Sequence, residues 1–261
     1  MVEICALASG SNGNCYYIGN NEDAILVDAG LSFKQILRRM EDKQLDPAKV
    51  KALFITHEHG DHIRGARVTG KKLDIPVYMT DGTFKAAFRT WQPISYLPVQ
   101  DNDPVRVGSL TIFPVLKSHD ALEPTSFRIE HEGISIGVFT DIGEPCENVK
   151  YHLRQCHVLF LESNYDQQML KEGPYPYYLK ARIDSTVGHL SNRQAFELAS
   201  EHAHPELQCI FLSHLSAENN SPELALNAFK PMERRCLVKM TDRFAASEIY
   251  TLRHQTTVSP G

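Results

Sequence analysis

The sequence predicts an α/β or α+β layer protein, in which β-sheets are faced by helices. Short apolar and β-branched runs recur along the 261-residue chain, and segments of helical period lie between them. A hydrophobic content of 42% is sufficient for a buried core. We find no internal repeat and no long Pro/Gly/Ser linker, so a single domain over residues 1–261 is the simplest interpretation.

The expected strands are short apolar runs bounded by turn residues. In chain order they cover residues 3–8, 24–28, 51–56, 76–79, 110–115, 126–130, 134–140, 158–161, 210–213 and 238–240.

Helices are fewer, and their start signals are clear. Apolar residues recur at helical spacing behind Ser32, which predicts an amphipathic helix over 33–43 with Ser32 as its N-cap. Two further helices are expected after Ser191 and at Ser221-Pro222, where a cap residue precedes a proline at the first helical position.

Charge and cysteine usage narrow the functional classes. Acidic residues outnumber basic ones by 32 to 27, and the net charge of −5 gives no general attraction to nucleic acid or to anionic lipid. No apolar run approaches the roughly 20 residues of a membrane span, and no signal-peptide pattern opens the chain, so we expect a cytoplasmic protein. The six cysteines form no C-x-x-C pair, which indicates ordinary buried thiols.

Histidine, with 12 copies, is the unusual residue, and its densest cluster follows a predicted strand. Residues 51–62 read KALFITHEHGDH. Because side chains alternate along a strand, His57 and His59 can share one cation, and Asp61 and His62 on the following turn can reach a second. The alternative is a polar turn that happens to be rich in histidine.

The motif H-x-H-x-D-H after a strand is the signature of metallo-β-lactamase-fold hydrolases, which this chain resembles in further segments. Val27-Asp28-Ala29-Gly30 looks like their early Asp-x-Gly, and His119, Asp141 and His214 look like their later metal ligands, each after an apolar strand. The resemblance implies a four-layer αββα sandwich with the site at the rim between its two sheets.

The resemblance also implies a pair of divalent metal ions. The family pattern assigns His57, His59 and His119 to one ion, Asp61, His62 and His214 to the other, and Asp141 to both. Two ions about 3.5 to 4 Å apart would leave room for a bridging water and would stabilise an in-line displacement. The donor set is compatible with Zn²⁺, Mn²⁺ or Fe²⁺. For Asp28 we expect hydrogen-bonding support of the metal loop, with ligation as the alternative.

The residue at position 141 and motifs outside the metal ligands favour phosphodiester chemistry. Aspartate at position 141, where the lactam-cleaving branch has cysteine, indicates oxygen-rich coordination. GHLSN at 188–192 and LSHLS at 212–216 resemble paired segments of the tRNA 3′-processing endonucleases (RNase Z). LESNY at 161–165 resembles a segment of the β-CASP nucleases, although the large β-CASP insertion is missing.

Three other segments resemble the YycJ/WalJ group of small bacterial metallo-hydrolases. They are ASGSNGN at 8–14, KARI at 180–183 and LSAENN at 215–220. Members of that group are described as DNA exonucleases linked to repair, so the resemblance implies such an activity here.

Catalytic roles are expected for Asp61, through its metal ion, and for His189 and Glu162. His189 is the candidate for protonating the leaving oxygen or holding a nonbridging phosphate oxygen, with Glu162 within hydrogen-bonding reach. The alternative is that His189 only caps the following helix. The remaining histidines are assigned to surface or packing roles: His131, His152, His157, His202, His204 and His254.

Substrate contacts are expected in two places. Ser9, Ser11 and Asn14 belong to a glycine-rich loop that either offers donors to an anion or simply connects two strands. Lys180 and Arg182 lie in a tyrosine-rich segment that either contacts nucleic acid or is a solvated loop packed by its own tyrosines.

The leading functional hypothesis is a binuclear metal-dependent phosphodiesterase, most simply a DNA exonuclease, with DNA favoured over RNA as partner. The alternatives on the same metal site are a small-molecule or cyclic phosphodiesterase, which the acidic net charge favours slightly, and an RNA-processing nuclease. A noncatalytic protein that binds a partner is a third class, and the complete ligand set argues against it. The sequence does not predict the oligomeric state.

Overall fold

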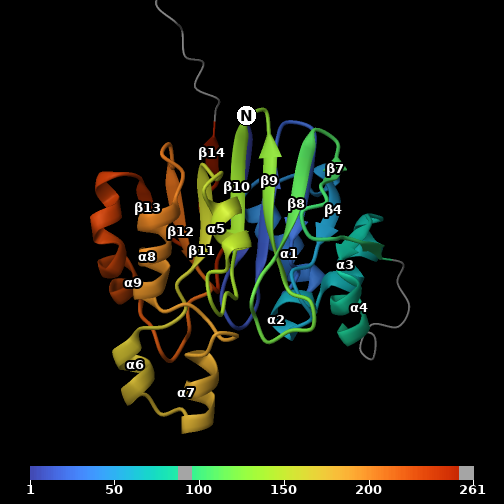
Figure 1. The fold of residues 1–261 in the computed structure, drawn as a ribbon. Coiled ribbons are helices and arrows are strands. Elements are labelled where there is room, and N and C mark those ends of the chain that lie inside the picture. The colour runs from blue at the N-terminus through green and yellow to red at the C-terminus, as the bar shows by residue number, and fades with distance from the viewer. Residues whose placement is uncertain (88–95, 253–261) are drawn as a thin grey trace, which may run out of the picture.

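Two facing β-sheets with helices on their outer faces make up the computed structural model, which describes residues 1–87 and 96–252 (Figure 1). The four layers confirm the predicted αββα sandwich. His254 lies outside the described residues, so its expected surface or packing role stays a prediction.

Each sheet has seven strands within the described ranges. The first sheet has the order β14 (Tyr250–Leu252), β1 (Val2–Ala8), β2 (Cys15–Gly19), β3 (Ala24–Val27), β4 (Val50–Phe54), β5 (Val77–Met79) and β6 (Leu97–Pro98). The second has the order β13 (Leu237–Met240), β12 (Cys209–Ser213), β11 (Val158–Glu162), β10 (Ile134–Phe139), β9 (Thr125–His131), β8 (Leu110–Leu116) and β7 (Val105–Val107).

The helices fall into an outer layer on each sheet and a separate pair. Those of the first half are α1 (Phe33–Asp42), α2 (Gly60–Ile63), α3 (Ala66–Leu73) and α4 (Asp81–Ala87), with a 3-10 turn at Pro47–Lys49. Those of the second half are α5 (Glu147–Leu153), α6 (Gln167–Glu172), α7 (Tyr177–Ile183), α8 (Asn192–His202) and α9 (Pro222–Phe229), with a 3-10 turn at Lys230–Arg234.

The central core lies between the two sheets, where the inward side chains of both meet. Phe54 of the first sheet packs edge-on against Phe127 of the second, with ring centroids 5.4 Å apart. Tyr16 and Phe160 approach to 4.9 Å across the same interface. These aromatic contacts hold the two sheets in register, and so fix the rim that both contribute to.

Each outer layer buries one apolar face of its helices. On α1, Ile36 and Met40 are buried against the first sheet, and Ser32 closes a capping box with Gln35 as the sequence predicted. On the second sheet α5, α8 and α9 cover a separate apolar cluster, and Ser191 makes the equivalent capping box on α8. The three helices expected from capping signals are therefore confirmed.

The pair α6 and α7 lies beyond the sheet ends and below the sandwich in the view of Figure 1. We call residues 166–184 the arm. The arm contains two short helices where the sequence left the choice between a nucleic-acid contact and a solvated loop, and α7 has no buried residue.

The carboxyl ends of five strands lie at one rim of the sandwich. Strands β10, β11 and β12 are parallel neighbours in the second sheet, and β3 and β4 are parallel neighbours in the first. The carboxyl ends of parallel strands meet at one edge of a sheet, so the polar residues that follow them gather there.

Within the described residues no helix is long and apolar enough to span a membrane. All six cysteines are free thiols, and all but the half-buried Cys146 are buried, as predicted.

Candidate metal centre

Three residues at the rim adopt a backbone conformation that most side chains avoid. Asp28, Asp141 and His214 follow β3, β10 and β12, and have φ angles of 62°, 55° and 55°. Aspartate and histidine tolerate this left-handed region better than most residues, and such strain concentrates at functional sites. It turns the three side chains inward from the strand ends.

A glycine lets the loop after β4 come close to the loop after β3. A Cβ on Gly30 would lie 1.6 Å from the carbonyl oxygen of Asp61. The same carbonyl accepts the backbone N–H of Asn14 at 2.8 Å, so three segments meet around Asp61. Only glycine permits this approach.

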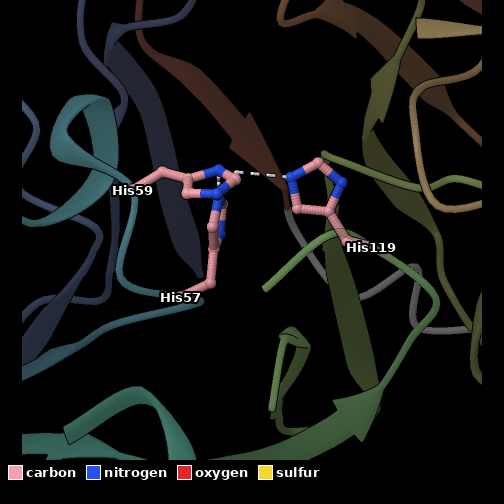
Figure 2. A group of neighbouring side chains, drawn as sticks. All are labelled: His57, His59 and His119. Atoms are coloured by element: carbon pink, nitrogen blue, oxygen red, sulfur yellow. Dashed lines mark hydrogen bonds between the residues drawn. The ribbon is translucent and has the colours of Figure 1, made fainter. Parts of the chain in front are cut away.

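The first group of potential metal ligands, which we call the first donor group, consists of three imidazoles from both sheets. Nε2 of His57 lies 3.1 Å from Nδ1 of His59, and the same nitrogen of His59 lies 3.4 Å from Nε2 of His119 (Figure 2). Nitrogens this close are spaced as they would be around a single ion.

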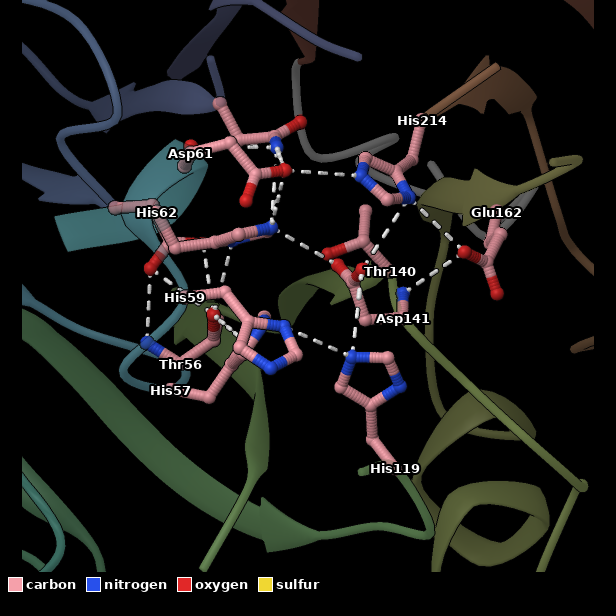
Figure 3. A network of polar contacts seen from close by, with 12 residues as sticks. Thr56, His57, His59, Asp61, His62, His119, Thr140, Asp141, Glu162 and His214 are labelled. Carbon is pink, nitrogen blue, oxygen red and sulfur yellow. Dashed lines mark hydrogen bonds and ion pairs between the residues drawn. The ribbon is translucent and has the colours of Figure 1, made fainter. Parts of the chain in front are cut away.

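The second donor group combines a carboxylate with two imidazoles. Oδ2 of Asp61 lies 3.5 Å from Nε2 of His62 and 3.5 Å from Nε2 of His214. Figure 3 shows the three side chains converging from α2 and from the loop after β12.

Asp141 lies between the two groups. Its Oδ2 is 3.2 Å from Nε2 of His62, and its Oδ1 is 3.8 Å from Nε2 of His119 (Figure 3). The side chain is 2% exposed, and Oδ2 makes no hydrogen bond within the described part of the chain despite its nearness to His62. A buried carboxylate oxygen in this state favours positive charge beside it.

The outward nitrogens of His57 and His119 meet fixed acceptors. Nδ1 of His57 lies 2.9 Å from Oγ1 of Thr56, whose hydroxyl donates to Asp28. Nδ1 of His119 lies 3.0 Å from the carbonyl oxygen of Gly188. These contacts place the proton of each neutral ring on Nδ1 and leave Nε2 to point inward as a donor of electrons.

The second group is anchored in the same manner by carboxylates. Nδ1 of His62 lies 2.7 Å from Oδ2 of Asp28, and Nδ1 of His214 lies 3.0 Å from Oε1 of Glu162. Among the described residues Asp28 belongs to none of the close groups of potential ligands, so its geometry matches the hydrogen-bonding support expected from the sequence.

Burial and charge act differently on the two groups. Burial lowers the pKa of His57 well below its ordinary value and that of His119 to about 4, so both rings are neutral near pH 7. Burial also acts to lower the pKa of His214, but the surrounding carboxylates, Asp141 first, outweigh it and raise that pKa to about 10. The pKa of His62 is raised well above its usual value by the same balance. The carboxylates around the second group therefore favour positive charge at that place.

These observations fit divalent metal ions. Among the residues that the structure describes, the inward ligands are imidazole nitrogens and carboxylate oxygens without a thiolate, and Asp141 has a buried oxygen without a hydrogen bond. The second group also attracts positive charge.

The model of a protein family described as "Beta-lactamase superfamily domain" matches residues 23–211. The chain belongs to this superfamily. It is 36% identical over 225 residues to exodeoxyribonuclease YycJ of Bacillus anthracis, an alignment that covers 84% of each chain. It is 33% identical over 231 residues to exodeoxyribonuclease WalJ of Streptococcus pneumoniae, covering 84% of this chain and 83% of the relative.

Membership of the YycJ/WalJ group is thereby confirmed, and the protein is a metal-dependent hydrolase of the metallo-β-lactamase fold. The metallo-β-lactamase-fold protein YhfI from Bacillus subtilis superposes with a TM-score of 0.71 at 17% identity, over 94% of this chain and 98% of that one. At this identity the similarity concerns the fold.

Next to the donor groups of this hydrolase lies the expected contact between Glu162 and His189. Nδ1 of His189 is 2.8 Å from Oε1 of Glu162. Burial acts to raise the pKa of Glu162, but the imidazoles, His189 first, outweigh it and lower that pKa to about 2. The N-cap of α8 is Ser191, so capping the helix is not what His189 does.

Glu162 also organises the backbone of the rim. It accepts the N–H groups of Asp141 and Ile142 at 3.1 and 2.9 Å and that of Leu190 at 3.0 Å. One carboxylate thus fixes the loop after β10 and the loop before α8. The Glu162 side chain is fully buried, whereas that of His189 is partly exposed.

The residues expected to contact substrate differ in their exposure and in their hydrogen-bond partners. Ser9 and Asn14 are buried: the Ser9 hydroxyl accepts the backbone N–H of His214, and Nδ2 of Asn14 lies 3.1 Å from Nε2 of His62. Ser11 is exposed in the connection between β1 and β2. The Lys180 ammonium donates to the carbonyl of Lys171, and Arg182 pairs with Asp120.

Sequence reasoning missed three residues of the site. Thr56 bridges His57 and Asp28, and buried Lys117 donates to the carbonyl of Thr140 next to Asp141. Asp120 lies beside the first donor group. The one available signal was position, because Thr56 directly precedes the HEHGDH motif and Asp120 directly follows His119.

Proposed function

We propose that the chain is a binuclear metal-dependent phosphodiesterase that acts on DNA as an exonuclease, in one hydrolase domain over residues 1–261. The observation that carries the proposal is the position of Asp141 between two donor groups, each of which has enough ligands for one ion. The names of the YycJ and WalJ relatives support DNA as the substrate and exonuclease as the activity. The buried free thiols are consistent with a reducing cytoplasm.

In this proposal one ion is held by His57, His59 and His119, and the other by Asp61, His62 and His214, with Asp141 shared. Such a pair supplies Lewis acidity and a nucleophile at neutral pH. Imidazoles and carboxylates without thiolate accommodate Zn²⁺, Mn²⁺ or Fe²⁺.

His189 delivers the proton that the reaction needs. Because its Nδ1 faces Glu162, the opposite nitrogen Nε2 is the one that can face a substrate. In the protonated ring Nε2–H donates to the leaving oxygen or to a nonbridging phosphate oxygen, and the ionised Glu162 stabilises the charge on the ring. Glu162 therefore acts on the substrate through His189, while its backbone contacts keep Asp141 in place.

The arm favours a polymeric substrate. Tyr177 and Tyr178 on α7 are 86% and 75% exposed, far more than a packing role requires. Arg182 lies on the same helix and reaches Asp120, which directly follows His119. In this proposal a nucleic-acid strand at the metal centre extends along α7, where its bases can stack on the exposed tyrosines without regard to sequence.

End-labelled nucleic acids test the proposal. Wild-type protein with added Mn²⁺ or Zn²⁺ is expected to release mononucleotides progressively from one end of single- or double-stranded DNA, and Asp61→Ala is expected to be inactive. Equal activity of the variant would attribute the cleavage to a contaminant or to another mechanism. Release of nucleotides from labelled RNA alone would replace DNA by RNA as the substrate.

A small or cyclic phosphodiester is the second candidate, and the net charge of −5 favours it. The dependence of activity on salt concentration distinguishes these two candidate functions. Activity on a polymer should fall steeply between 50 and 200 mM salt because phosphate contacts release counterions, whereas a small ester should show weak dependence.

A further inference from the structure

One imidazole of the first donor group lacks the fixed acceptor that the others have. His59 points its Nδ1 inward, so its Nε2 is the outward nitrogen. In the described ranges no hydrogen bond forms at this Nε2, and the acceptor that it approaches is Oδ1 of Asp120, at 3.9 Å. His57, His62, His119 and His214 each have an outward contact of 3.0 Å or less.

One carboxylate oxygen of Asp120 is available to accept a hydrogen bond. Its side chain is 23% exposed, but Oδ1 is buried and makes no hydrogen bond with any residue that the structure describes. The other oxygen, Oδ2, pairs with the guanidinium of Arg182. The backbone N–H of Asp120 donates to the carbonyl of Val187 at 2.9 Å. Arg182 thus holds the carboxylate and the backbone contact holds residue 120, while Oδ1 has no hydrogen bond in the described part of the chain.

The free oxygen also lies 3.3 Å from Nε2 of His119. Since His119 faces a carbonyl oxygen with Nδ1, the neutral ring presents a lone pair at Nε2. Two electron-rich atoms at this separation repel each other unless positive charge lies near both. Asp120 is therefore adjacent to the place where an ion would bind, although no group of donors within 4.8 Å of one another in the described chain includes it.

We propose that Asp120 is the positioning residue of His59. When an ion occupies the first group, Oδ1 of Asp120 accepts the Nε2–H of His59, and Arg182 holds the carboxylate for that contact. Metal-bound histidines usually donate their second N–H to a carboxylate or carbonyl, which fixes the ring and strengthens the ligand. The inference rests on the proposed metal centre, and it makes the arm, through Arg182, part of the support of one ion.

Metal affinity tests this role directly. Binding of Zn²⁺ to metal-free protein is measured by competition with a chromophoric chelator, which resolves the affinity of each ion. Asp120→Ala is expected to weaken one ion about 10- to 100-fold and to leave the other unchanged. Asp120→Asn should recover most of the loss, because an amide oxygen still accepts a hydrogen bond.

Arg182 and a control complete the test. Arg182→Ala should weaken the same ion by less, and the double variant should bind no more weakly than Asp120→Ala, because both changes remove one contact. Arg193→Ala is the matched control, since Arg193 pairs with Glu197 on the exposed face of α8. Circular dichroism establishes that every variant is folded.

Two results would overturn the inference. Wild-type affinity for both ions in Asp120→Ala would show that His59 needs no partner. A loss in Asp120→Asn as large as in Asp120→Ala would make Asp120 a direct ligand, because an amide is a poor replacement for a coordinating carboxylate. If the wild-type protein itself binds no ion, the proposed function fails instead.

Discussion

The carboxylate of Asp28 lies 2.7 Å from Nδ1 of His62, and neither side chain reaches solvent. Asp28 also accepts the backbone N–H and the hydroxyl of Thr56. The residue after β3 therefore orients the loop after β4, and a change at Asp28 should affect an ion that it does not touch.

Asp28→Asn is expected to weaken binding of one metal ion about 10- to 100-fold. Asparagine tolerates the left-handed backbone at this position, so the loss reports the carboxylate rather than the fold. Chelator competition measures it. Asp74→Asn is the matched control, because Asp74 has a φ of 52° but lies exposed at the end of α3. Equal affinities in the two variants would refute the supporting role.

His189→Ala is expected to lower kcat about 10²- to 10⁴-fold on a phosphodiester with an alkoxide leaving group. The loss should be much smaller with a p-nitrophenyl ester, because that leaving group needs no proton. Steady-state kinetics on both esters measure the difference. His202→Ala, at the far end of α8, is the control. A similar loss on both esters would assign His189 to binding and not to proton transfer.

Metal-free protein should lose stability as the pH rises from about 6.5 to about 10. In the unfolded chain histidine has a pKa near 6.5. The carboxylates around His214 raise its folded pKa to about 10 against the effect of burial. Its bound proton therefore stabilises the fold fully below pH 6.5, and the stabilisation disappears through pH 10. Thermal unfolding across this range measures the effect, and a flat or rising profile would contradict it.

Tyr177→Ala and Tyr178→Ala are each expected to raise KM for single-stranded DNA about tenfold, which is within the 1 to 3 kcal/mol typical of base stacking. Kinetics on a small phosphodiester should not change, since such a substrate has no neighbouring bases to stack on these rings. Tyr151→Ala serves as the control, because Tyr151 is 59% exposed on α5. An unchanged KM for DNA would remove the arm from substrate binding.

Much of the fold could be predicted because its signals are local. The helix after Ser32 combines a cap with apolar residues at helical spacing, and each expected strand is a continuous apolar run. Strand β2 (Cys15–Gly19) was missed, although the glycine-rich loop before it does connect two strands. Helix α7 could not be predicted, because no residue of it is buried and no apolar period marks it.

The candidate site, like the fold, could be predicted only where its signals are local in the sequence. Close spacing in HEHGDH identifies His57 to His62, and the strand before each later donor identifies His119, Asp141 and His214. Partners that meet across the fold leave no such pattern. Asp120 gains its environment from Arg182 on the arm, and Thr56 from Asp28. Those contacts depend on how the two sheets and the arm pack.

The number of metal ions bound by the purified protein tests the central claim most directly. Elemental analysis after equilibration with Zn²⁺ or Mn²⁺ should find two ions per wild-type chain and fewer in Asp141→Asn, where the oxygen shared between the donor groups is altered. One ion or none in active wild-type protein, or two ions in the variant with unchanged affinity, would contradict a binuclear centre bridged by Asp141.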